Sequence, residues 1–467
     1  MRVAFSVQTP NSLRNFESVL RMLGDRGHET TILLHSAAPP EALDALLPTL
    51  LEEVPGLRCE RAEHDLKRGR LKLGADVRSS IDLLRFLEPR FHETYRERSL
   101  RRAPRAMRRL AATPVLQVGW VRRAIGFVLA ACERVLPVDR AVRDELAALR
   151  ADVVLLTPYL GLRTVQPEVL RAARALGIPA AVCVASWDNL TSKSSLRPLP
   201  DRVFVWNETQ RREAVELHGV PAGAVVVTGA QCFDHWFEWQ PSPRAEFCER
   251  VGIDPEQPIV LYTCFTPFVR AANQDEAGFV ERWLRALRTA QDPVLQNATV
   301  LVRPHPKRLE AWRDVDLADH GAVVWPREPP LPTDRSSKAD YFDSLHHSAA
   351  VVGLNSTAML EAGLVGRPVL TILVPEFWES QEGTLHFHYL LEVGGGLLRV
   401  TRSLDEHTTQ LAEAVRGADE GAAERSRRFV EEFVRPHGRN RAATPLFVDA
   451  IEQLASRTAP ATGASTL

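Results

Sequence analysis

The chain has 467 residues, of which 45% are hydrophobic and 25% are charged, and its formal net charge is −1. This length predicts two domains, and the composition is that of an ordinary globular protein. The near-zero net charge excludes a global field that would attract nucleic acid, so any electrostatic preference for a partner must be local. Because the six cysteines show no CxxC spacing, reduced thiols are favoured over a metal site.

The beginning of the chain, Met1 to Pro10, has the pattern of a strand start and lacks the architecture of a signal peptide. The uncharged apolar run from Ala124 to Cys132 is far too short to span a bilayer. We therefore expect a cytoplasmic protein. Any association with a membrane would be peripheral, at the inner membrane face.

The first half of the chain alternates apolar runs with helical patterns. A strand from Arg2 to Val7, a helix with Phe16, Val19 and Leu20 on one face, and a strand from Thr30 to Leu34 form a β-α-β opening, which is typical of a parallel sheet. Between 76 and 150 the pattern is helical throughout, and this predicts a helical insertion. Further strands are predicted at 152–157, 180–185, 202–206 and 225–228.

The alternation restarts after the Pro-rich segment 240–243, which reads as a link between domains. Strands are predicted there at 259–263, 299–303, 322–325, 350–354 and 369–373. The fold class is therefore α/β, with two Rossmann-like doubly wound domains at 1–239 and 240–455 that face a cleft. We expect the helices at 404–455 to pack partly on the first domain, and the tail at 456–467 to be disordered.

Ligands of doubly wound sheets bind beyond the carboxyl ends of the strands, and polar residues follow several of the predicted strands. In Arg303-Pro304-His305-Pro306-Lys307 two prolines fix the backbone around an imidazole, and two cations flank it. This pattern suits an anionic ligand such as a diphosphate. A Pro-rich turn with solvated charges is the alternative.

A second motif runs from Gly353 through Asn355, Ser356 and Thr357 to Glu361. A strand that turns into a helix presents N–H groups and the positive end of the helix dipole, which is an anion site. Glu361 lies one helical turn beyond Thr357 and could reach a ribose hydroxyl. Helix capping by Ser356 or Thr357 explains the same residues without a ligand.

Two further segments carry candidate polar residues. Asp188, between Trp187 and Asn189, follows a predicted strand and could act as a general base, although Asp-Asn is also ordinary turn chemistry. His386 and His388 point the same way if their segment is extended. We discount a metal pair there, because the sequence offers no third ligand nearby.

With these motifs, the chain resembles the GT-B class of glycosyltransferases, and within it the CDP-glycerol glycerophosphotransferases and bacterial sialyltransferases. The resemblance covers most of the chain, and it rests on the turn Arg26 to Thr30, Val227-Thr228-Gly229 with Asp234, Arg303 to Pro306, and Asn355 through Pro368.

The resemblance implies that the C-terminal domain binds the nucleotide donor and the N-terminal domain the acceptor. His305, Ser356 and Thr357 would then hold the nucleotide and phosphates, and Glu361 the ribose. Many retaining members carry a second Glu eight positions earlier. This chain has Gly353 there, which favours an inverting mechanism with Asp188 as the base.

We therefore predict a metal-independent glycosyltransferase of glycan or glycoconjugate biosynthesis that needs no cofactor. Its substrates would be a nucleotide-activated donor and a hydroxyl acceptor. The alternatives are a CDP-polyol phosphotransferase, a nucleotide-sugar epimerase and a non-catalytic nucleotide-binding homologue. The predicted catalytic residues are Asp188 and His305. The predicted donor-site residues are Arg303, Lys307, Asn355, Ser356, Thr357 and Glu361, and the predicted acceptor-side residues are Asn11, Trp187, Asn189, His386 and His388.

One segment points to a partner beyond the substrates. Arg96 to Arg109 contains seven arginines and one Glu, and the amphipathic stretch from Leu116 to Val135 follows it. Residues 96–135 could contact an anionic membrane surface, which would suit a lipid-linked or polymeric acceptor. A solvated helix in an arginine-rich protein is the alternative. No nucleic-acid partner is expected.

Overall fold

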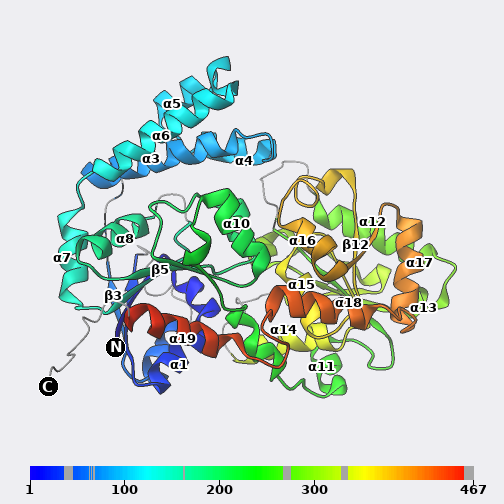
Figure 1. Ribbon diagram of the computed structural model, residues 1–467. Coiled ribbons are helices and arrows are strands. Elements are labelled where there is room, and N and C mark those ends of the chain that lie inside the picture. Colours follow the sequence, from blue (N-terminus) through cyan, green and yellow to red (C-terminus); the bar gives the residue numbers. More distant parts are fainter. Residues whose placement is uncertain are drawn as a thin grey trace. The chain divides into compact units, whose positions relative to one another are not determined.

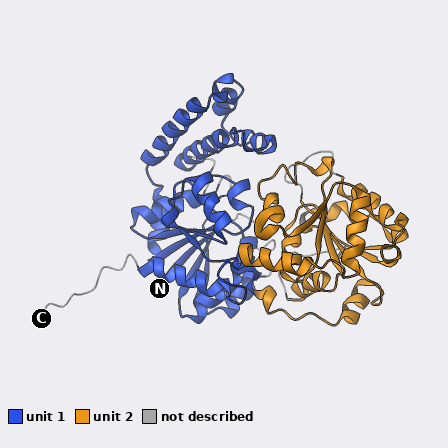
Figure 2. Cartoon of the chain, turned by 45° about the vertical axis from the view of Figure 1, so that its right-hand side comes forward, with its two compact units in different colours: residues 1–234, 435–467 blue, residues 235–434 orange. Residues whose placement is uncertain are grey.

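The computed structural model describes residues 1–35, 46–62, 64, 66, 69–160, 164–266, 275–327 and 335–456. Figure 1 shows two parallel sheets with helices packed around each of them. The chain divides into two compact units, residues 1–234 with 435–467 and residues 235–434 (Figure 2). Each unit holds one sheet, of seven and six strands, and this confirms the predicted pair of doubly wound α/β domains.

The sheet of unit 1 has the strand order β3-β2-β1-β4-β5-β6-β7, and neighbouring strands are parallel throughout. Its strands are β1 Arg2–Val7, β2 Glu29–Leu34, β3 Leu57–Arg61, β4 Val153–Thr157, β5 Ala180–Cys183, β6 Arg202–Val205 and β7 Val225–Val227. The central strands are apolar on both faces, so each face carries its own core of helix side chains.

Helices flank this sheet on both faces. They are α1 Glu17–Asp25, α2 Leu46–Glu53, α7 Arg140–Ala148, α8 Gln166–Ala175, α9 Asn189–Ser192, α10 Glu208–His218 and α19 Ala443–Ser456. Local signals explain the ends of α10: the Asn207 side chain accepts a hydrogen bond from the Gln210 N–H, and Gly219 closes the helix with a φ of 69°.

Four more helices, α3 Gly69–Phe86, α4 Glu93–Leu100, α5 Arg105–Ala111 and α6 Gly119–Val135, form an arm of unit 1 (Figure 1). The arm has a small core of its own, built around Leu83, Leu84 and Leu116. The predicted insertion at 76–150 is thus helical, but the arm begins earlier, at Gly69. Helix α7 packs with α8 on the core of the sheet through Val142 and Leu146, and therefore lies outside the arm.

The last helix, α19, belongs to unit 1, in line with the expectation that the helices at 404–455 pack partly on the first domain, although the predicted boundaries had placed it within 240–455. The ring of Phe447 packs against Phe16 and Phe204, with ring centroids 5.9 and 5.2 Å apart. Asp234 holds the start of this segment, because it accepts hydrogen bonds from the Thr444 N–H and from the guanidinium of Arg435. The expected disordered tail at 456–467 lies, beyond Ser456, outside the described residues.

The sheet of unit 2 has the order β10-β9-β8-β11-β12-β13. Its strands are β8 Ile259–Thr263, β9 Thr299–Arg303, β10 Ala322–Val324, β11 Ala350–Gly353, β12 Val369–Ile372 and β13 Leu398–Thr401. Its helices are α11 Arg244–Val251, α12 Glu276–Thr289, α13 Pro293–Asn297, α14 Arg335–His346, α15 Thr357–Leu364, α16 Phe387–Glu392, α17 Leu404–Val415 and α18 Ala422–Phe429. The strand order reverses between β8 and β11, which makes this pair the topological switch point.

Two strands, β3 and β13, are missing from the sequence-based expectation. Both are edge strands, and both mix apolar residues with charged ones such as Arg58 and Arg399. These two edge strands therefore lack the continuous apolar run that marks the central strands and also the other two edge strands, β7 Val225–Val227 and β10 Ala322–Val324. Among the described residues, no helix has the length and apolar character needed to cross a membrane.

Candidate functional site

The switch point of unit 2 brings two predicted segments together. Thr263, the last residue of β8, pairs with Gly353, the last residue of β11. A Cβ on Gly353 would lie 2.7 Å from the Thr263 hydroxyl and 3.0 Å from the side chain of Met359. Glycine therefore permits the close approach of β8, β11 and α15 at the position where doubly wound sheets bind ligands.

Two hydroxyl groups meet at this point. Ser356 Oγ lies 3.4 Å from Thr263 Oγ1, and Thr263 is only 2% exposed. Sequence reasoning placed Thr263 in a strand but missed it as a site residue. The sequence feature that points to Thr263 is a polar residue at the end of an otherwise apolar strand next to the switch point.

Helix α15 begins directly after these hydroxyls. Ser356 is its N-cap residue, with an extended backbone at φ −148° and ψ 158°, but within the described chain its side chain accepts no capping hydrogen bond. The first-turn N–H groups of a helix have no partner inside the helix, and the dipole is positive there. The N-terminus of α15, which starts at Thr357, can thus receive an anion beside the Ser356 hydroxyl.

His305 follows β9, the strand next to β8. Pro304 is buried and His305 half-buried, and the His305 carbonyl accepts a hydrogen bond of 2.8 Å from the Arg308 N–H, in the 3-10 turn Pro306–Ala311. The Cys264 N–H donates to the Arg303 carbonyl at 3.0 Å and joins the ends of β8 and β9. The motif therefore lies at the same carboxyl edge as Thr263. The side chain of Lys307 lies outside the described residues.

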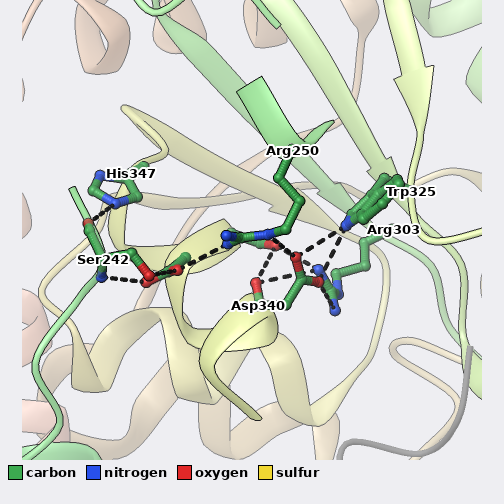
Figure 3. Close-up of polar contacts among 8 residues, drawn as sticks. Ser242, Arg250, Arg303, Trp325, Asp340 and His347 are labelled. Carbon is green, nitrogen blue, oxygen red and sulfur yellow. Dashed lines mark hydrogen bonds and ion pairs between the residues drawn. The ribbon is translucent and has the colours of Figure 1, made fainter. Parts of the chain in front are cut away.

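Arg303 lies in an ion-pair network, shown in Figure 3. Its guanidinium is 2.9 Å from a carboxylate oxygen of Asp340 on α14 and lies over the ring of Tyr341. Asp340 also accepts from Trp325 Nε1 at 3.1 Å and pairs with Arg250 at 3.3 Å. The charge of Arg303 is thus already balanced inside unit 2, where the side chain fixes α14 to the ends of β9 and β10.

The same network continues around α11. Arg250 also pairs with Asp343 at 3.1 Å, and Asp343 accepts from the Ser242 N–H at 3.0 Å and from its hydroxyl at 2.6 Å. The Ser242 carbonyl in turn lies 2.8 Å from His347 Nε2 (Figure 3). These contacts hold the segment that precedes α11 against α14, so this part of the network is structural.

Glu361 is half-buried on α15 and accepts a hydrogen bond from the hydroxyl of Tyr341. Since Tyr341 also lies beneath Arg303, the two predicted donor-site residues are linked through one tyrosine. Sequence reasoning missed Tyr341 because it lies on α14, which carries neither motif.

Asn355 ties the β11 turn to a neighbouring loop. Its side-chain amide donates to the Ser380 carbonyl and lies 3.5 Å from His386 Nε2. Gln381 binds the carbonyls of Leu354 and Ile372 at 3.2 and 3.0 Å, so the loop is fixed across the ends of β11 and β12.

The common direction that an extended segment would give His386 and His388 does not arise. His386 is the buried N-cap residue of α16, and His388 lies within that helix, so the segment is not extended. Positions two apart on a helix point to different faces. His388 contacts the Glu382 carbonyl at 3.0 Å. In the described part of the chain, no three His, Cys, Asp or Glu side chains gather as a metal site.

A buried carboxyl lies behind the end of β8. Glu276, at the start of α12, accepts hydrogen bonds from the Phe265 N–H at 3.0 Å and the Tyr262 hydroxyl at 3.4 Å. Burial raises the pKa of Glu276 to about 8. The group therefore carries its proton at neutral pH, and it was not among the predicted site residues.

The remaining candidates lie in unit 1. Asp188, whose side chain is 22% exposed, accepts from the hydroxyls of Ser186 and Ser192 at 2.8 and 2.7 Å and pairs with Lys193 at 3.4 Å. Trp187 is buried.

The two other unit 1 candidates differ in burial. Asn189 is buried, and its amide oxygen accepts from the Ala185 N–H at 3.2 Å. Asn11 is exposed in the 3-10 turn Pro10–Asn15 after β1. The contacts of Asp188 and Asn189 define the shape of the turn after β5.

No protein-family model and no curated protein sequence matches the chain. Solved structures are similar over nearly its whole length. The UDP-GlcNAc 2-epimerase from Neisseria meningitidis bound to UDP-GlcNAc has a TM-score of 0.53 at 13% identity, over 97% of this chain and 100% of that one. A glycosyltransferase from Rickettsia africae has a TM-score of 0.54 at 8% identity, over 97% and 98%. The wall teichoic acid polymerase TagF has a TM-score of 0.52 at 10% identity, over 98% and 89%. At these identities the likeness shows the fold alone, and it supports the GT-B-like fold.

Proposed function

We propose that unit 2 binds a nucleotide-activated donor at the carboxyl ends of β8, β9 and β11, and that the protein transfers the donor's glycosyl group to a hydroxyl acceptor. The observation that carries this proposal is the arrangement of Thr263, Ser356 and the N-terminus of α15 at the switch point. Hydroxyls and helix N–H groups bind phosphate oxygens without a metal ion.

The similar structures support the substrate class. One of them is described as bound to UDP-GlcNAc, and another is a glycosyltransferase. The proposed donor contacts are His305, Lys307, Asn355, Ser356 and Thr357, with Glu361 on the ribose. Arg303 would act through Tyr341, because its own charge is balanced by Asp340.

On the acceptor side, Asp188 is the proposed base that deprotonates the attacking hydroxyl, with inversion at the anomeric carbon. Lys193 and the hydroxyls of Ser186 and Ser192 fix the orientation of this carboxylate. Trp187, Asn189 and Asn11 are the proposed neighbours of the acceptor.

The test begins with binding of the full chain to UDP, GDP, dTDP and CDP and to their sugar conjugates, followed by product analysis with hydroxyl acceptors. Release of a nucleoside diphosphate supports glycosyl transfer. Release of CMP supports the alternative, transfer from a CDP-linked polyol or of a sialyl group. Nucleotide binding without turnover supports a non-catalytic protein.

His305→Ala is the decisive variant, and it should lower turnover at least about tenfold, because the imidazole would lose its contact with the donor. Its free energy of unfolding should change by less than about 1 kcal/mol, since the side chain is only half-buried. His320→Ala, at another half-buried histidine of unit 2, is the matched control. Equal turnover of His305→Ala and wild type contradicts the proposed role.

A nucleotide-sugar epimerase is the second candidate, favoured by the similarity to UDP-GlcNAc 2-epimerases. An epimerase needs no acceptor. Conversion of a nucleotide sugar in the absence of any acceptor, followed by NMR, would favour this reaction over transfer.

A further inference from the structure

The outermost helix of the arm has an apolar face that the described chain leaves exposed. On α6, Trp120 is 68% exposed, Phe127 74%, Val128 58% and Val135 80%. These positions are separated by seven, eight and fifteen residues, so they share one face of the helix. A helix on the surface of a soluble domain normally turns polar residues to this side.

The opposite face of α6 packs against the core of the arm. Ile125 and Leu129 pack against the core that contains Leu83 and Leu84 of α3. Helix α6 is therefore apolar on two sides, and folding of the arm uses only one of them. The exposed side is a surface feature that needs another explanation.

The segment that contains this face is rich in positive charge. Residues 98–132 contain eight arginines and no Asp, Glu, Lys or His, a formal charge of +8 in a chain whose total is −1. The arginines that are exposed in this segment are Arg101, Arg105, Arg108, Arg109 and Arg123. The next acidic residue along the chain, Glu133, is buried and faces Arg78 at 3.5 Å. No acidic side chain within the segment offsets the charge.

We propose that α5 and α6 bind the surface of an anionic bilayer. The apolar face of α6 would enter the boundary between headgroups and acyl chains, and the arginines would pair with lipid phosphates. Trp120 suits this depth, because tryptophan favours the membrane–water interface. At 17 residues, with Arg122 and Arg123 as its fourth and fifth residues, α6 would lie along the surface and not cross it.

Charge decides between a bilayer and a second copy of the chain. Two arms that met through α6 would bring two segments of +8 together, and like charges at an interface oppose association. An anionic bilayer offers apolar depth and negative charge in the same place, as the arm requires.

The inner part of the arm contacts the loop that carries Asp188. Arg85 donates to the Leu190 carbonyl at 3.0 Å, and Arg98 donates to the Ser192 carbonyl at 3.2 Å. Asp82 accepts from the Ser195 N–H at 2.8 Å. If the proposed function holds, a bilayer-bound arm would carry the acceptor-side loop at the membrane, and the acceptor would be lipid-linked.

The experiment is flotation of the full chain with vesicles, which needs no catalytic activity and can thus succeed or fail independently of the proposed reaction. We expect binding to phosphatidylcholine vesicles that contain phosphatidylglycerol, weak binding to phosphatidylcholine alone, and a loss of binding as salt increases. The double variant Phe127→Ser, Val128→Ser should bind at least about tenfold more weakly, because it removes two exposed apolar groups that the bilayer would bury.

Charge reversal tests the contribution of the arginines to binding. Reversal of Arg105, Arg108 and Arg109 to Glu should weaken binding about fivefold or more for each arginine. The matched control reverses Arg140, Arg143 and Arg212, which are exposed in unit 1 outside the arm, and Leu51→Ser controls for an exposed apolar residue elsewhere. Both sets of test residues are exposed, so folding should persist, and thermal unfolding checks this.

Three outcomes would overturn the proposal: equal binding to neutral and anionic vesicles, equal loss in the test and control variants, or no binding by the folded wild-type chain. In the last case, sedimentation that shows a dimer disrupted by Phe127→Ser would assign the face to a second copy.

Discussion

The buried carboxyl of Glu276 should make the stability of unit 2 depend on pH in a defined direction. Burial raises the pKa of Glu276 from an ordinary value of 4.5 to about 8. Below pH 4.5 the carboxyl is protonated in both the folded and the unfolded chain and does not lower the free energy of unfolding. As pH rises from 4.5 to 8, the unfolded chain ionises while the folded chain keeps the proton, so the free energy of unfolding falls.

The size of this effect follows from the two pKa values. At about 1.36 kcal/mol per pH unit, the loss between pH 4.5 and 8 reaches about 5 kcal/mol as an upper limit. Glu276→Gln does not titrate, and its amide oxygen can still accept from the Phe265 N–H and the Tyr262 hydroxyl. The Glu276→Gln variant should therefore be more stable than wild type near pH 8, and the difference should vanish near pH 4.5.

Hydrogen exchange of β8 and α12, measured by mass spectrometry at both pH values, reports the stability of unit 2 separately from that of unit 1. Glu281→Gln, at an exposed position of the same helix, is the matched control. A Glu276→Gln variant that is less stable than wild type at high pH, or a difference that does not change with pH, would refute the reasoning.

Two further substitutions test other buried or bonded groups. In the described chain, neither ring nitrogen of His407 has a hydrogen-bond partner, and burial lowers its pKa from 6.5 to about 3. Since the unfolded chain then binds a proton more readily, stability is lost as pH falls from 6.5 towards 3, and His407→Leu should raise the urea midpoint near pH 4 more than at neutral pH. Asp188→Asn should lower turnover by about 10²–10⁴ if Asp188 is the base, whereas Ser192→Ala, which removes one hydrogen bond to Asp188, should retain most activity. Equal losses in both would assign Asp188 to the structure of its turn.

The fold was largely predictable because central parallel strands are marked by continuous apolar runs. The strand β8, Ile-Val-Leu-Tyr-Thr, is buried throughout and was recognised from its sequence. The edge strands β3 and β13 interrupt their apolar residues with charged or polar ones, and local pattern alone could not separate them from loops. The packing of α19 on unit 1 was expected for part of the segment 404–455, but its partner contacts, such as that of Phe447 with Phe16, join residues far apart in sequence.

The positions of the site motifs were predictable for the same reason: His305 and Ser356 follow recognisable strands. The contacts of these motifs could not be predicted from the sequence. The ion pair of Arg303 with Asp340 joins residues 37 apart, on a strand and on a helix that carries no motif. Whether a cation next to a strand end is free to bind a ligand depends on such distant partners, which the motif itself does not contain.

Because Arg303 already has an ion-pair partner, other groups must stabilise an anion at the switch point. Arg250 and Arg303 face Asp340 and Asp343, so the four charges of this network cancel. Breaking the Arg303–Asp340 pair to free the arginine would leave a half-buried carboxylate with less compensation, which costs free energy. A diphosphate bound as proposed would therefore interact mainly with the N-terminus of α15, the Ser356 hydroxyl and His305. Arg303 would contribute by holding Tyr341, and through it Glu361, in place.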